Sequence, residues 1–269
     1  RVFLPLLLFM NIYTADLETS VSPRLIVFAL ASLLIVFLLS MIIVPRLELE
    51  NRKRGVLVQA FCRSNFIIFG IPVATTLYGP ESAAVASILV GAIVPFINTV
   101  AVITLEYFRG SKPSLSKIVR GVVGNPIILG AAAALLMVQT GLRLPSVIDA
   151  FFQEMALIAT PLALIILGGS VTFTTVKSNR KQLVGGILSR LVLVPSLGLL
   201  AATLLGFRNA ELVILMALFS SPAAVSSYTM ALQMEGDGDL AGQLFVFTTV
   251  FSIITIFLWV YLLMLLNLI

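Results

Sequence analysis

Two hydrophobic segments of this chain are each interrupted by a proline with small and polar residues around it. The first runs Arg63-Ser-Asn-Phe-Ile-Ile-Phe-Gly-Ile-Pro72 and the second Ser220-Ser-Pro-Ala-Ala-Val-Ser-Ser-Tyr228. A proline inside a helix removes one amide donor and clashes with the carbonyl four residues back, so it frees backbone polar groups. In lipid, such groups are tolerated only where protein or a water-filled cavity satisfies them. The interruptions are therefore either ordinary kinks or parts of a binding site, and their polar neighbours favour the site.

The candidate substrate-binding residues follow from these two interruptions. They are Asn65, Gly70 and Pro72 in the first and Ser221, Pro222, Ser226 and Tyr228 in the second, with Arg63 beside them. Half-helix N-termini carry partial positive charge, which suits a carboxylate. We expect these residues to line one cavity near the middle of a membrane, with Arg63 at its flank.

Three ionisable residues lie well inside hydrophobic segments. Arg63 and Arg190 either extend their guanidinium groups to the lipid headgroups or attract a carboxylate towards the site. Glu154 is a candidate proton-coupling carboxylate, because burial raises the pKa of such a group. The alternative for Glu154 is an interfacial residue that bonds a neighbouring helix.

The residues that are missing from the sequence exclude several function classes. There is no histidine and one cysteine, Cys62, so we expect no metal site and no cofactor. Without histidine or paired carboxylates inside the hydrophobic segments, an enzyme is not expected. No Gly-x-x-x-x-Gly-Lys-Ser/Thr run is present, so ATP is not the direct energy source. The net charge of +5 lies in short loops, which argues against a nucleic-acid partner.

The elements that must position these residues are membrane-spanning helices. Hydrophobic residues make up 59% of the 269 residues and charged residues 11%, whereas a soluble domain carries roughly a quarter charged residues. The apolar residues come in long blocks, as helices that cross a bilayer require. The sequence predicts an all-α membrane protein with spans at residues 1–13, 25–44, 56–78, 83–107, 121–138, 147–171, 183–205, 212–233 and 240–268.

The basic residues of the loops predict the orientation. Eleven lie after the second, fourth and sixth spans, against Arg24, Arg143 and Arg208 in the alternate loops. Because basic loops stay in the cytoplasm, the C-terminus is expected outside. The acidic run Glu235-Gly-Asp-Gly-Asp239 falls on the cytoplasmic side, where acidic residues count little.

The two halves of the chain show the same segmentation. A shift of 156 residues lays Pro5 on Pro161, Arg24 on Arg180 and four spans over four others. The span at 121–138 has no counterpart, so we expect a first helix to be missing upstream of Arg1. The predicted organisation is a first repeat at 1–108 (helices 2–5), a cytoplasmic linker at 109–120 and a second repeat at 121–269 (helices 6–10). Five helices per repeat invert the second copy, as in secondary transporters.

Several motifs resemble the auxin efflux carrier family. They are the Asn65 to Pro72 interruption, the Asn125-Pro126-Ile-Ile run, the Thr160 to Gly169 run and the Thr248-Thr-Val-Phe-Ser252 stretch of the last span. The resemblance implies a ten-helix inverted-repeat carrier with a scaffold bundle and a transport bundle that holds two crossed, broken helices. Members of that family export auxin in plants and carry malate, malonate or similar carboxylates in bacteria. The long central loop of many plant members is absent, and Ser221 stands where they have asparagine, so this chain resembles a bacterial-type member.

These observations together predict a secondary active transporter. The expected substrate is a small organic anion such as a carboxylate, moved across the plasma membrane by alternating access, with protons as the candidate coupling ion. The expected setting is the bilayer of a bacterial cytoplasmic membrane, with a homodimer as a candidate assembly. The alternatives are a sodium-coupled symporter of the bile-acid type and a membrane sensor that transports nothing.

Overall fold

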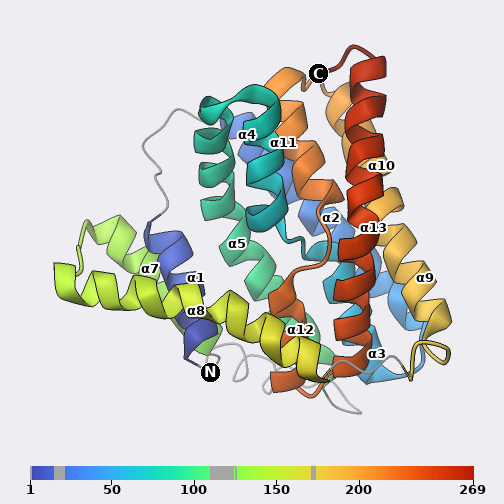
Figure 1. Ribbon diagram of the computed structural model, residues 1–269, viewed down its shortest axis with the longest axis horizontal. Helices are drawn as coiled ribbons and strands as arrows, with labels where there is room; N and C mark the ends of the chain where they lie inside the picture. The colour runs from blue at the N-terminus through green and yellow to red at the C-terminus, as the bar shows by residue number, and fades with distance from the viewer. Residues whose placement is uncertain (1, 15–21, 110–123, 125, 171–173) are drawn as a thin grey trace.

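The computed structural model describes residues 2–14, 22–109, 124, 126–170 and 174–269, and most of these residues are helical (Figure 1). Five helices are long and apolar enough to cross a membrane, namely Pro23–Leu47, Ile88–Phe108, Ser146–Gly169, Arg180–Leu204 and Gly238–Leu265. Regular strands do not occur in these ranges. The prediction of an all-α membrane protein is therefore confirmed.

Each predicted span overlaps one helix or a succession of shorter ones. In chain order these are α1 (Phe3–Tyr13), α2 (Pro23–Leu47), α3 (Asn51–Cys62), the π-helical turn η1 (Phe66–Gly70), α4 (Ile71–Tyr78), α5 (Pro80–Phe108), α7 (Pro126–Thr140), α8 (Ser146–Ser170), α9 (Arg180–Leu188), the π-helical turn η2 (Ser189–Leu193), α10 (Val194–Leu204), α11 (Asn209–Ser220), α12 (Val225–Gln233) and α13 (Gly238–Leu265). Of the predicted linker 109–120, only Arg109 lies within the described residues, so its course stays a prediction.

Two of the spans are broken in the middle. The third span leaves helical geometry at Arg63–Asn65, between α3 and η1, and the eighth leaves it at Ser221–Ala224, between α11 and α12. The second break contains Pro222, as the proline argument expects. The first break instead precedes Pro72 by about two helical turns.

Pro72 deforms its helix in a different way, and α10 shows the same effect. The π-helical turn η1 ends two residues before Pro72, and η2 ends two residues before Pro195. Each proline lacks the amide that would bond the carbonyl four residues back, so the preceding turn rearranges. At η2 the freed carbonyl of Leu191 accepts a hydrogen bond from Trp259 Nε1 of α13, 3.0 Å away.

The helices form two groups, each with a core of its own, and Leu167 of α8 also packs into a core of the crossing group described below. The first group, α1, α7 and α8, lies to the left in Figure 1, where α8 runs obliquely across the view. Its core contains Phe9, Tyr13 and Phe152. A Cβ on Gly130 of α7 would lie 2.9 Å from the carbonyl oxygen of Pro5, so only glycine permits this approach of α7 to α1.

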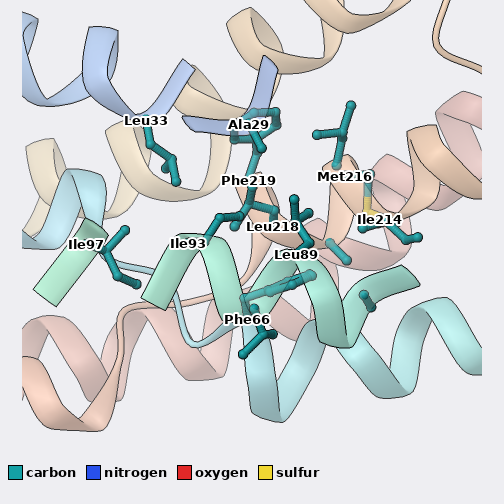
Figure 2. Packing of buried hydrophobic residues seen from close by; sticks show 14 of the residues in the cluster. Ala29, Leu33, Phe66, Leu89, Ile93, Ile97, Ile214, Met216, Leu218 and Phe219 are labelled. Carbon is teal, nitrogen blue, oxygen red and sulfur yellow. The ribbon is translucent and has the colours of Figure 1, made fainter. Parts of the chain in front are cut away.

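The second group, which we call the crossing group, contains α2, both broken spans, α5, α9–α10 and α13. Its core packs side chains of α2, η1, α5 and α11 together (Figure 2). Phe66, Leu89 and Phe219 are among the buried side chains. This core supports the breaks from one side and leaves their other side facing the first group.

The acidic loop after α12 is anchored to basic residues of the crossing group. Arg109 Nη2 lies 2.5 Å from Glu235 Oε1, and Arg52 donates to the carbonyl oxygens of Glu235 and Gly236. The hydrogen bond from Arg109 lowers the pKa of the Glu235 carboxyl below its ordinary value. The acidic loop thus lies at the same end of the molecule as the basic loops, and their charges neutralise it locally.

Candidate functional site

The two breaks touch each other at the centre of the crossing group. The amide of Asn65 donates to the carbonyl oxygen of Pro222 at 2.8 Å, and Ser64 and Ala223 form an isolated antiparallel bridge. The backbone at Arg63 and Ser221 is extended, which lets the two chains run past each other. The hydroxyl oxygen of Thr248 on α13 accepts a hydrogen bond from the amide of Ala223, 3.2 Å away. Backbone groups that the breaks release therefore bond across the crossing.

The C-terminal ends of α3 and α11 meet the guanidinium group of Arg190. Its Nε donates to Ser221 O at 2.8 Å, its Nη1 to Phe61 O at 3.0 Å and its Nη2 to Leu218 O at 3.1 Å. Arg190 is fully buried, so the interpretation that it extends to the lipid headgroups is wrong. It cannot contact the headgroups because its donors are directed at carbonyls inside the protein.

A cavity of about 230 Å³ lies beside the crossing, between the two helix groups, and Arg190 is not among its lining residues. Its walls are contributed by α1, η1, α5, α8, α12 and residues of both breaks. The lining residues are Phe3, Leu7, Arg63, Ser64, Asn65, Phe66, Ile67, Ile68, Ile93, Val94, Ile97, Asn98, Ala159, Leu162, Ile166, Ala224, Val225, Ser226, Thr229 and Gln233. Polar side chains gather at the breaks and on neighbouring turns, and the rest of the wall is apolar.

Arg63 is the charged residue of this cavity. Its Nη2 donates to Asn98 Oδ1 at 2.6 Å and to Ser226 Oγ at 2.7 Å, while Nη1 contacts the sulfur of Met230. The residue is 3% exposed, so it does not extend to the headgroups either. Within the described ranges, no acidic residue lies at ion-pair distance from it. A buried cation held only by neutral groups attracts an anion strongly.

Two further polar groups of the cavity wall make no hydrogen bond to the described residues. They are Asn98 Nδ2 and Ser64 Oγ, and both are buried. Because Asn98 Oδ1 accepts from Arg63, its amide nitrogen is turned the other way and keeps two N–H donors. An unpaired buried donor costs about 1–3 kcal/mol, which a bound acceptor would recover.

The structure brings some of the sequence-derived candidates together at the cavity and leaves others elsewhere. Arg63, Asn65 and Ser226 line it. Ser221 and Pro222 lie at the crossing, where their carbonyls bond Arg190 and Asn65. The remaining candidates are not among the lining residues: Gly70 ends η1, Pro72 lies in α4, Tyr228 is buried among apolar side chains of α3 and α13, and Glu154 is exposed on α8.

Sequence reasoning missed Asn98, Thr229 and Gln233 as cavity residues. Asn98 is the only amide side chain in the predicted span at 83–107. Its position indicates a helix face that is otherwise apolar. Val94 lies one helical turn before Asn98, and Ile93 and Ile97 lie on the adjacent row of that face. A polar residue inside an apolar span points to a functional cavity.

The comparison with known proteins gives one family. Residues 1–260 match the model of a family described as membrane transport protein. A search of curated proteins finds no match.

Proposed function

We propose a function from the premise that this chain belongs to the auxin efflux carrier family of membrane transport proteins. The chain is a membrane transporter. In our proposal it is a secondary active carrier of small organic anions, and the cavity between the two helix groups is its substrate site.

The unpaired charge of Arg63 is the observation that carries this proposal. The guanidinium group is buried at the cavity wall without an acidic partner among the described residues. The first turn of α12, at Val225 and Ser226, lines the same wall and adds the partial positive charge of a helix N-terminus. A carboxylate in the cavity would neutralise this charge and accept hydrogen bonds from Asn98 Nδ2 and the Ser64 hydroxyl.

The rest of the lining favours a substrate with one carboxylate and an apolar body. Arg63 is the sole cation among the lining residues, and much of the remaining wall is built from apolar residues such as Leu7, Ile97 and Leu162. A second carboxylate would have to lose its water against these apolar walls without a cation partner. We therefore favour small monocarboxylates over dicarboxylates.

The position of the cavity supports alternating access. One wall belongs to α1 and α8, and the other belongs to the crossing group, which has its own core. Relative movement of the two groups would open the cavity to one side and close it to the other. The proposal puts the basic ends of the helices in the cytoplasm and the C-terminus outside, and it gives Glu154 no role because this residue is exposed on α8.

Uptake into proteoliposomes tests the proposal. We expect a labelled short-chain monocarboxylate to accumulate and to be displaced better by other monocarboxylates than by malate. Arg63→Gln should lower the apparent affinity by at least tenfold, since one charge-assisted hydrogen bond contributes about 1.5–3 kcal/mol. Arg46→Gln is the matched control, because it removes an exposed arginine that donates to Ile42 O at 2.6 Å and does not line the cavity.

Three results would contradict the proposal. Binding without uptake would identify a sensor, and strict dependence on a sodium gradient would favour the bile-acid type of symporter. Unchanged affinity in Arg63→Gln would show that the cavity at Arg63 is not the substrate site.

A further inference from the structure

Arg190 is a buried cation for which substrate recognition gives no reason. It is 0% exposed, it is not among the residues that line the cavity, and it is bonded to the second break at Ser221 O. None of the ion pairs among the described residues includes it. Its three hydrogen bonds to the described residues all go to backbone carbonyl oxygens.

These carbonyls come from both broken spans at the same point. Phe61 O belongs to the last turn of α3, Leu218 O to the last turn of α11, and Ser221 O to the break that follows. The final carbonyls of a helix have no partner within the helix and carry about half a negative charge together. Two such ends converge here, so a positive charge at this point is strongly stabilised.

A cluster of freed carbonyls at a pair of broken helices is the kind of environment that coordinates a coupling metal ion in secondary transporters. Here the guanidinium group occupies it. Arg190 lies in the π-helical turn η2, which positions its guanidinium group at these carbonyls. Such turns are frequent at functional sites. The carbonyl of Leu191 in the same turn is held by Trp259, which fixes the turn against α13.

We propose that Arg190 is a positioning residue that serves as a tethered cation at the crossing. It takes the place of a coupling metal ion, so transport needs neither sodium nor potassium. It holds the ends of α3 and α11 together and thereby sets the position of Arg63 and Asn65 at the cavity. The inference rests on the proposed carrier function.

Arg190→Ala tests this role by leaving a space that a free guanidinium ion can enter. In proteoliposomes we expect uptake to fall by about 100-fold or more, because the carbonyls lose their partner. Millimolar guanidinium should restore part of the uptake and should raise the melting temperature of Arg190→Ala in detergent. Arg190→Met is the matched control, because its side chain fills the space without charge, so guanidinium should not rescue it.

The wild-type protein gives a second, independent measurement. Uptake should be unchanged when choline replaces all sodium and potassium, and a requirement for either metal ion would overturn the proposal. Failure of guanidinium to restore either uptake or thermal stability in Arg190→Ala would overturn it too, as would wild-type uptake by Arg190→Met. If Arg190→Ala does not fold, Arg190→Lys should keep part of the uptake, and complete loss in that folded variant would count against the idea. Absence of uptake by the wild-type protein would instead refute the carrier function itself.

Discussion

Replacement of Asn98 by aspartate should separate the stability of the protein from its ability to bind an anion. Asn98 Oδ1 accepts a hydrogen bond from Arg63 Nη2 at 2.6 Å, and an aspartate side chain has the same shape, so the variant places a carboxylate directly against the guanidinium. The buried cation gains the acidic partner that it lacks among the described residues. We therefore expect a higher melting temperature in detergent together with weaker substrate binding.

The magnitude follows from the distance between the charges. Two opposite unit charges about 4 Å apart attract each other by about 4 kcal/mol at an effective dielectric constant of about 20. The new carboxylate competes for this attraction with a substrate carboxylate. If the substrate carboxylate loses a third to a half of its attraction to Arg63, the apparent affinity falls by roughly 10-fold to 30-fold, since each 1.4 kcal/mol is tenfold.

The assay compares Asn98→Asp with Asn98→Ala in proteoliposomes and in detergent. Alanine removes the hydrogen bond but leaves the charge of Arg63 unneutralised, so the protein should be less stable while its affinity for the anion changes less than in the aspartate variant. Equal affinity in Asn98→Asp and the wild type would refute the reasoning, because it would show that the charge of Arg63 does not hold the substrate.

Three other predictions address topology, packing and pH. In a Cys62→Ala background, cysteine at the exposed Leu49 should react with an impermeant thiol reagent from the cytoplasm and cysteine at Leu142 only from outside; the reverse would overturn the orientation. Gly198→Ala should lower the melting temperature, because its Cβ would lie 2.7 Å from the Phe219 ring. Gly185→Ala, with open space around it, should raise stability by about 0.5–1 kcal/mol, and equal effects would refute this packing argument. Because Arg109 lowers the pKa of Glu235, Glu235→Gln should be less stable than the wild type at pH 7. That difference should vanish as the pH falls through the lowered pKa, which lies below the ordinary value of 4.5; a difference that persists in acid would exclude the ion pair as its cause.

The sequence predicted the helices well because hydropathy is a local property. Each of the nine predicted spans overlaps a helix or a succession of helices among the described residues, and five of these helices are long and apolar enough to cross a membrane. The helix α3 begins at Asn51, ahead of its predicted apolar start, because hydropathy does not detect a polar first turn. The sequence also predicted that the spans with Pro72 and Pro222 are broken. The exact site of the first break could not be predicted from the sequence. Pro72 is accommodated by a π-helical turn, and the helix ends instead near Asn65, whose amide bonds Pro222 O.

The residues of the candidate site were harder to predict, because they depend on which helix faces meet. Arg63 and Arg190 look alike in the sequence, and only the packing of α5, α11 and α12 turns one towards the cavity and the other towards carbonyl ends. Tyr228 follows Ser226 closely in the chain, yet it is directed into the apolar core. Glu154 is exposed because the first group leaves that side of α8 uncovered.

The two sides of the cavity belong to different helix groups and differ in chemical character. In the proposed carrier, the charge and the donors for a carboxylate come from the first break, α5 and α12, whereas Leu7 of α1 and Ala159 and Leu162 of α8 would shape the space for the remainder of the substrate. Substitutions in α1 and α8 can therefore enlarge, shrink or reshape that space without disturbing Arg63. If the proposed site is correct, a few apolar replacements would change which acid the carrier accepts, while the residues proposed to hold the acid group stay the same.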